Sequence, residues 1–145
     1  MKNIKTITLL IIICKILSSC CNPSERNRYI TFINKSDKNI ACQKVWSPHI
    51  ITADSLFFCG FGATQILMDS IRIFECPKRD NGWEVSFNVI PFLQFSVMDD
   101  SIYEQYYKEP CDTIRKYVPI LHIYQLTLED LRRMNWTVVY PPEEE

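Results

Sequence analysis

The chain is poor in glycine, and this scarcity narrows the chemistry that it can carry. Three glycines occur among 145 residues, where about 7% is usual, so a glycine-rich loop around a phosphate is hardly available. Gly60 and Gly62 supply two glycines of a dinucleotide-binding motif, but Gln65 stands where the third belongs. The Gly-x-Ser-x-Gly turn of hydrolase nucleophiles does not occur in the sequence. We therefore expect neither nucleotide binding nor a serine hydrolase of that type.

An excess of charge of one sign is also missing. The sequence has 16 basic and 17 acidic residues, with a net charge of -1. Binding that depends on neutralising many phosphates needs a clear basic excess, and here the basic residues are scattered or paired. We therefore expect no nucleic-acid partner. Because 47% of the residues are hydrophobic and 12% are aromatic, the chain is too apolar to be disordered and can form one core.

No hydrophobic run is long enough for a permanent transmembrane helix. The apolar run over 7–17 has 11 residues and is interrupted by Lys15, whereas a helix that spans the bilayer core needs about 20. The chain begins with Lys2 and Lys5, continues with this short apolar run, and reaches small residues before a break. A basic start, a short apolar run and small residues are the parts of a secretory signal.

The end of this segment, Leu17-Ser18-Ser19-Cys20, resembles the bacterial lipobox. The resemblance implies a signal peptide over 1–19, lipid attachment at Cys20 and a polar tether over 20–28, although Lys15 departs from the usual pattern. The mature chain then has 126 of the 145 residues, and losing three of the 16 basic residues leaves a net charge of -4. This acidity argues against a second, electrostatic membrane contact. The alternatives are a simple cleaved signal or a buried N-terminal helix of a cytosolic protein.

The expected location is the bacterial cell envelope, with the lipid chains in the outer membrane. Each buried methylene contributes about 0.8 kcal/mol, so several acyl chains hold a protein on a bilayer without spanning it. The residues that follow Cys20 contain no dense acidic run, so display on the outer face is not signalled.

The cysteines allow either disulfides or buried thiols. Four of the seven lie in the body of the chain, and four cysteines permit three full connectivities. Free cysteines are also among the most buried residue types, so both alternatives stay open. The gaps of 17, 17 and 35 residues do not fit the close cysteine pairs of structural zinc sites, and we expect no metal and no cofactor. The four are Cys42, Cys59, Cys76 and Cys111.

Apolar and β-branched patterns predict mostly extended structure from Tyr29 onward. Residues 29–33 and 40–46, separated by a polar turn over 34–39, predict a β-hairpin. Asp69 joins two further extended segments, and Pro91 precedes an apolar stretch that suits a buried strand. The other predicted strands are 55–59, 64–68, 70–74, 92–98, 120–124 and 136–140.

Short helices are predicted mainly in the second half of the chain. Residues 127–134 give the strongest pattern, with Thr127 as a cap, acidic residues in the first turn and basic residues in the last. Ser101 and Glu104 have the spacing of a capping box and predict a second helix that ends before Pro110. A third is expected over 112–117, and a single helical turn over 83–87.

These elements predict one α+β domain over 29–140, followed by an acidic tail over 141–145. Strands in a run with helices gathered late favour an antiparallel β-sheet, or a small β-sandwich, decorated with short helices in the C-terminal half.

The C-terminal third resembles a group of small Bacteroidetes lipoproteins. It contains a Leu-Thr-Leu-Glu-Asp-Leu helix over 126–131, then Asn-Trp-Thr over 135–137 and Tyr-Pro-Pro over 140–142. The segment His122-Ile123-Tyr124-Gln125-Leu126 departs from the group, which often has Lys-Arg-Tyr-Asp-Leu there. The resemblance implies an envelope location and the helical form of 83–87. It implies no activity, cofactor or catalytic residue.

Candidate chemistry is sparse. Asp99, Asp100 and Glu104 form an acidic cluster, for which acids at a helix N-terminus are the simpler interpretation. A nucleophilic pair such as Cys111 with His122 has no local motif to support it.

The tryptophans suggest glycan stacking, although a domain of this size needs such side chains in its core. We therefore expect a non-catalytic binding module with an envelope protein or glycan as partner. An enzyme that uses His49, His122 or a reduced cysteine is the alternative. The tryptophans are Trp46, Trp83 and Trp136.

Overall fold

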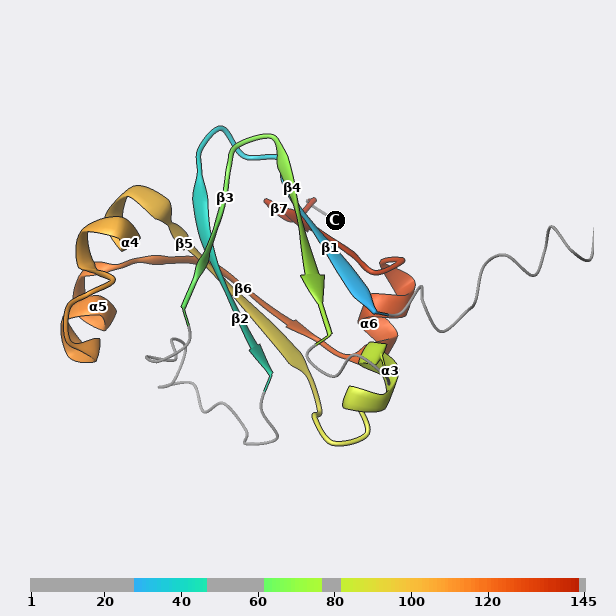
Figure 1. Cartoon of the computed structure of the whole chain (residues 1–145). Helices are drawn as coiled ribbons and strands as arrows, with labels where there is room; N and C mark the ends of the chain where they lie inside the picture. Colours follow the sequence, from blue (N-terminus) through green and yellow to red (C-terminus); the bar gives the residue numbers. More distant parts are fainter. Residues whose placement is uncertain (1–27, 47–61, 77–81, 144–145) are drawn as a thin grey trace, which may run out of the picture.

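The computed structural model describes residues 28–46, 62–76 and 82–143, and these hold seven strands in two sheets together with four short helices (Figure 1). The predicted α+β class with a sheet-dominated core is confirmed. The predicted strand at 55–59, His49 and the predicted lipid attachment at Cys20 lie outside the described residues.

The three-stranded sheet has the order β4-β1-β7, and the four-stranded sheet has the order β3-β2-β5-β6. β1 pairs antiparallel with β4 and parallel with β7, whereas every pair in the four-stranded sheet is antiparallel. The strands are β1 (Tyr29–Asn34), β2 (Ile40–Trp46), β3 (Thr64–Ile66), β4 (Ser70–Glu75), β5 (Leu93–Asp99), β6 (Ile120–Leu126) and β7 (Thr137–Tyr140).

The predicted hairpin over 29–46 is wrong in its pairing, although both of its strands form. β1 and β2 lie in different sheets and do not pair with each other. The Asn34 side chain helps to hold the connection open, because its Nδ2 donates to the backbone oxygens of Lys38 and Leu67 at 2.9 and 3.0 Å. Each strand turns one face toward the same core, with Ile30 and Phe32 on β1 and Ile40 and Cys42 on β2. Apolar residues in two nearby strands do not distinguish neighbours in one sheet from neighbours across a core.

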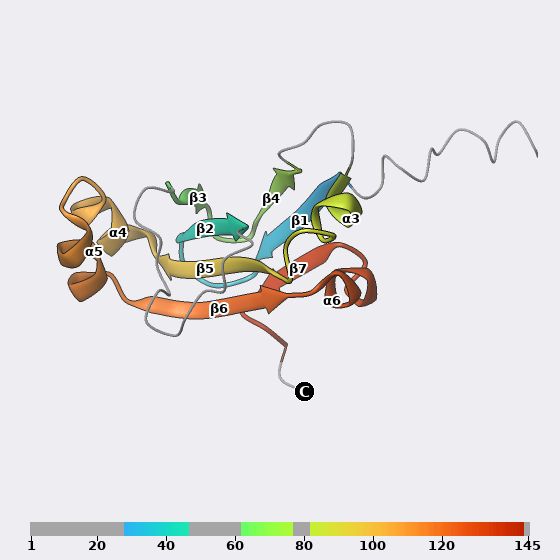
Figure 2. The ribbon, with the colours of Figure 1, turned by 90° about the horizontal axis from the view of Figure 1, so that it is seen from below.

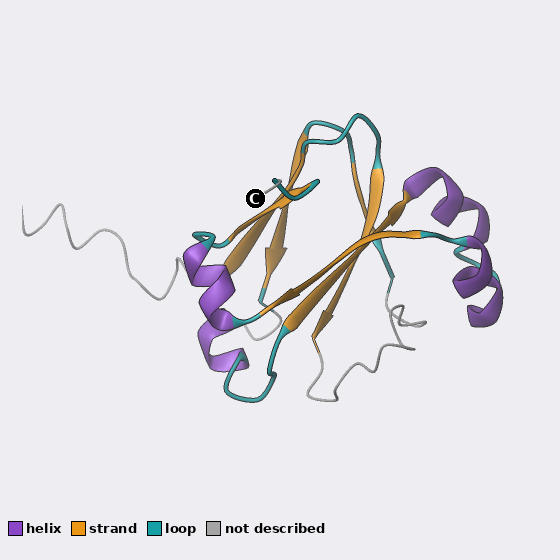
Figure 3. Ribbon diagram, turned by 180° about the vertical axis from the view of Figure 1, so that it is seen from behind, coloured by secondary structure: helices purple, strands orange, loops and turns teal. Residues whose placement is uncertain are grey.

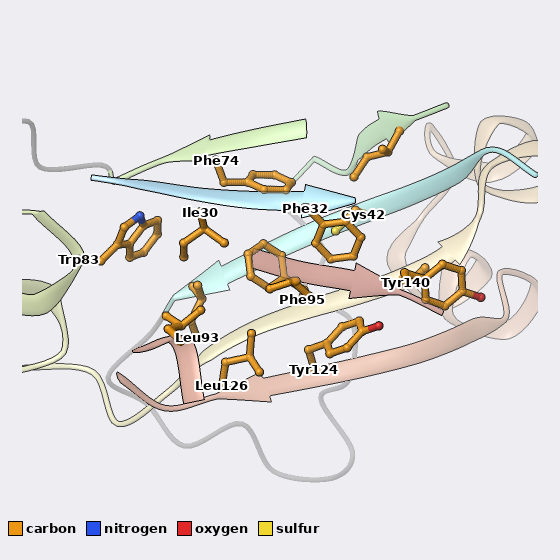
Figure 4. Close-up of a cluster of buried hydrophobic side chains, with 14 of the residues drawn as sticks. Ile30, Phe32, Cys42, Phe74, Trp83, Leu93, Phe95, Tyr124, Leu126 and Tyr140 are labelled. Atoms are coloured by element: carbon orange, nitrogen blue, oxygen red, sulfur yellow. The ribbon is translucent and has the colours of Figure 1, made fainter. Parts of the chain in front are cut away.

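The core lies between the inner faces of the two sheets (Figure 4). Phe32 of β1 has no exposed area, and its ring centroid lies 6.3 Å from that of Phe74 and 5.5 Å from that of Phe95. These residues belong to β1, β4 and β5, so the aromatic contacts join the two sheets. Trp83 closes one end of this core and is also fully buried.

The helices lie at two opposite ends of the sheets (Figures 2 and 3). One end carries α4 and α5, and the other carries α3 and α6. All four predicted helices are present, although Trp136, with φ 59°, belongs to the turn after α6 and not to the predicted strand. Their bounds are α3 (Gly82–Ser86), α4 (Asp100–Tyr106), α5 (Cys111–Tyr117) and α6 (Leu128–Arg133).

The helix caps follow local hydrogen bonding, and one predicted cap is wrong. Thr127 caps α6 as predicted, and its capping box is completed by Asp130. The capping box predicted for Ser101 and Glu104 does not form. Asp99 caps α4 instead, because its carboxylate accepts hydrogen bonds from the backbone nitrogens of Ser101 and Ile102.

Candidate functional site

The cysteines divide between the two alternatives that the sequence leaves open. Cys111 is disulfide-bonded, whereas Cys42 and Cys76 are free and buried, with 1% and 2% of their surface exposed. Burial raises the pKa of the Cys42 thiol, so this residue stays protonated. Because the thiolate is the reactive form, Cys42 is structural.

The hypothetical nucleophilic pair of Cys111 and His122 is not supported. Cys111 carries no free thiol, because it is in a disulfide. His122 packs against two tyrosines, with ring centroids 4.4 Å from Tyr124 and 6.5 Å from Tyr140. Burial lowers the pKa of His122, so the imidazole is neutral at neutral pH. These contacts explain His122 as a packing residue of β6.

The acidic cluster has structural partners. Asp99 caps α4 and lies 3.1 Å from the Lys38 ammonium, and Asp100, only 5% exposed, accepts a hydrogen bond from Gln65 at 2.5 Å. Within the described residues, no three His, Cys, Asp or Glu side chains are grouped to hold a metal ion. Asp99 is therefore explained as an acidic residue at a helix N-terminus. Asp100 is buried in the protein interior.

Lys44 is a charged residue at the edge of the core, and no sequence motif marks it. Its ammonium lies 5.6 Å from the Phe74 ring centroid and 5.2 Å from that of Trp83, and donates to the backbone oxygen of Glu75 at 3.2 Å. Desolvation lowers the pKa of this lysine. Strand alternation could have predicted this position, because Lys44 follows Ile40 and Cys42 on the inward face of β2. Lys44 closes the core where β2 approaches the end of β4.

The tryptophans pack in or against the hydrophobic core. Trp83 is fully buried, and Trp46 and Trp136 are partly buried and pack against the main cluster. They do not form an exposed stacking platform. The exposed aromatic residues of the described chain are tyrosines.

Tyrosines gather at the end of α4 and on α5, and we call this set the tyrosine surface: Tyr106, Tyr107 and Tyr117, with Lys108 and Lys116. Tyr106 is partly buried, because it also packs against a core cluster. The rings of Tyr106 and Tyr117 stack nearly parallel, with centroids 5.1 Å apart and an interplanar angle of 11°. Tyr107 is 44% exposed and Tyr117 is 47% exposed. The ammonium groups of Lys108 and Lys116 lie 5.1 and 5.0 Å from the ring centroids of Tyr107 and Tyr117. The surface therefore combines large apolar area with hydroxyl and ammonium donors.

A second exposed surface covers the outward side of the three-stranded sheet. Ile71 and Ile73 of β4 are 63% and 59% exposed, and Tyr29 of β1 is 43% exposed. Ile33 of β1 pairs with Ile71 on one side and with Val139 on the other, so these three side chains lie next to one another on the same face. The outward face of such a sheet is ordinarily polar. We call this set the apolar sheet face: Tyr29, Thr31, Ile33, Ile71, Ile73, Thr137 and Val139. Glu75, which pairs with Tyr29, is the charged residue at the end of this face on β4.

A pocket of about 340 Å³ borders the apolar sheet face at β7. The Tyr124 hydroxyl donates to the Val139 backbone oxygen at 2.6 Å, and Glu143 lies 3.4 Å from the Lys35 ammonium. The lining is mainly apolar and does not bring a nucleophile together with a base. It consists of Tyr124, Met134, Thr137, Val139, Pro142 and Glu143.

No family model, curated protein or solved structure matches this chain. Among the described residues, no helix has both the length and the apolar character needed to cross a membrane.

Proposed function

We propose that this protein is a bacterial envelope lipoprotein that is held on a membrane by lipid at Cys20 and acts as a non-catalytic binding module. The short apolar run, the lipobox-like Leu17-Ser18-Ser19-Cys20 and the polar tether support the anchor. Acyl chains at Cys20 would hold the domain on the bilayer without a spanning helix. The outer membrane is the proposed location.

The position of the tyrosine surface is the main support for the proposed binding role. α4 and α5 lie at the end of the domain away from β1, where the tether joins the fold (Figures 1 and 2). A partner could therefore reach the tyrosine surface without competing with the membrane for space. We place the binding site there.

The chemistry of the tyrosine surface favours a protein partner. Tyrosine offers a rigid ring that buries roughly 150–250 Å² and a hydroxyl that keeps a hydrogen bond, which is why it is enriched at protein interfaces. The lysines beside Tyr107 and Tyr117 can pair with acidic side chains of the partner. A few such aromatic anchors commonly carry most of the binding energy.

Glycan binding is the second candidate, and the exposed rings of Tyr107 and Tyr117 favour it, because a sugar can stack on an exposed aromatic ring. Catalysis is less well supported, because Cys42 and Cys76 are buried and His122 packs between tyrosines. His49 lies outside the described residues.

Capture of crosslinked partners from intact cells tests the proposal. We expect Tyr117→Ala to reduce recovery of a specific envelope protein at least about tenfold, because an interface anchor contributes roughly 1.4 kcal/mol or more. Val89→Ala is the control, since Val89 is 65% exposed and belongs to neither the tyrosine surface nor the outward face of the three-stranded sheet. Equal recovery with both variants would contradict the tyrosine surface as the binding site. Retention on an immobilised envelope polysaccharide that depends on Tyr117 would instead support the glycan candidate.

A further inference from the structure

The apolar sheet face lies on the strand that continues the lipid tether. Cys20 and Tyr29 are nine residues apart, and an extended chain reaches at most about 3.3–3.6 Å per residue, so the tether reaches about 30 Å. A domain of about 100 residues has a radius of gyration of about 13 Å, so its diameter is comparable with this reach. If the proposed lipid anchor at Cys20 is correct, the tether lets the start of β1, and the face that β1 carries, lie against the bilayer.

The side chains on this face suit an apolar environment. Ile71 and Ile73 project from an edge strand with 63% and 59% of their surface exposed, and their cross-strand neighbours Ile33 and Thr31 carry no charge. Tyr29 begins β1 on the same face, and tyrosine is a residue that favours the membrane interface. Neighbouring apolar side chains that are exposed in this way often mark a contact with a membrane or with another protein, because covering them removes apolar surface from water.

Charged groups at the border of the face are paired. Arg28 lies 3.3 Å from Glu75 near the start of β1, and Lys35 lies 3.4 Å from Glu143 beyond its end. The border therefore has no strong net charge that would attract an anionic or cationic partner. This agrees with a mature chain of net charge -4, which gives no electrostatic attraction to anionic lipid.

We propose that the apolar sheet face rests on the lipid surface of the membrane that holds the anchor. The inference depends on the lipid anchor of the proposed function. The short tether supplies an effective concentration in the millimolar range, so a weak apolar contact suffices to orient the domain. The face lies shallowly at the boundary between headgroups and acyl chains, and the tyrosine surface on α4 and α5 points away from the bilayer.

Contact quenching by brominated lipids tests this orientation. The acylated mature chain is reconstituted in vesicles of phosphatidylethanolamine and phosphatidylglycerol, with plain or brominated acyl chains. A tryptophan is introduced as Ile73→Trp on the face, or as Val89→Trp, a control that is 65% exposed and follows α3. The emission of the unsubstituted chain is subtracted, because Trp46, Trp83 and Trp136 contribute to it.

We expect the added emission of Ile73→Trp to shift to the blue in plain vesicles and to be lost in brominated ones, with neither effect for Val89→Trp. Adding Ile71→Lys to Ile73→Trp should remove the lipid quenching, because the charge opposes burial of the face in lipid. High salt should leave the quenching unchanged, because the contact is apolar.

Two results would overturn the inference. Equal lipid quenching at both positions would show that the domain has no preferred face on the membrane. Protection of Ile73→Trp from aqueous iodide without quenching by brominated lipid would assign the face to a second copy of the chain. Mass spectrometry of the same sample separates these results from a missing anchor: with Cys20 acylated, only this inference fails, and with Cys20 bare, the proposed function fails as well.

Discussion

Tyr124 and Val139 connect the two sheets at the pocket, through a hydrogen bond of 2.6 Å from the phenol to the backbone oxygen. Tyr124 belongs to β6 of the four-stranded sheet, and Val139 belongs to β7 of the three-stranded sheet. Tyr124 is only 8% exposed, although the bond itself is partly buried beside the pocket. Burial accordingly raises the pKa of this phenol. The bond fixes β7, which carries part of the apolar sheet face.

Removing this hydroxyl should destabilise the fold. We expect Tyr124→Phe to lower the free energy of unfolding by about 0.5–1.5 kcal/mol, because the Val139 oxygen loses a partly buried hydrogen bond. Urea unfolding measures the change, and Tyr117→Phe is the control, since Tyr117 is 47% exposed. Equal effects of the two substitutions would contradict a structural role for the Tyr124 bond.

The caps of α4 and α6 should also be measurable. Thr127→Ala should cost about 0.5–2 kcal/mol of stability, because it removes an N-cap and its capping box. Asp99→Ala should cost a similar amount and Glu104→Ala much less, since Asp99 and not the Ser101–Glu104 pair caps α4. Thermal unfolding of the three variants tests this order. A larger loss with Glu104→Ala than with Asp99→Ala would restore the capping box predicted from the sequence.

Acid should weaken the fold partly through Asp99 and Asp130. Hydrogen bonds from Ser101 and Thr127, respectively, lower the pKa values of these carboxyls below the ordinary value of 3.8. A carboxyl with a lowered pKa in the folded state stabilises the protein above its unfolded pKa, and this contribution is lost as the pH falls through the folded pKa. We expect stability to decline as pH falls below about 5, with a shallower decline for Asp99→Asn. An unchanged acid profile in this variant would contradict the role of Asp99.

The free thiols should be unreactive in the folded protein. Cys42 and Cys76 are almost fully buried, so iodoacetamide should modify them only after denaturation. Mass spectrometry of peptides alkylated with and without denaturant checks this expectation. Rapid alkylation of Cys76 in the native state would reopen the enzyme hypothesis.

Local features of the fold were predictable because local chemistry determines them. Thr127, followed by acidic and then basic residues, marks α6, and the apolar run after Pro91 marks β5. Strand partners were less accessible, because β1 and β7 pair in parallel although 102 residues lie between Asn34 and Thr137. The Asp99 cap was missed because Ser101 and Glu104 offered a familiar spacing only two residues later.

The candidate sites depended on features that sequence periodicity does not show. Tyr106 and Tyr117 come together only because α4 and α5 fold against each other. Ile71 and Ile73 follow an ordinary strand alternation, which does not reveal that both face outward. The free and bonded states of the cysteines likewise follow from tertiary packing.

The most direct test of the account is the mass of the N-terminal peptide of the protein purified from its native membrane. We expect a chain that begins at Cys20 and carries acyl chains there, together with loss of acylation in Cys20→Ala. A bare thiol at Cys20, with residues 1–19 still attached in a cytosolic fraction, would contradict it.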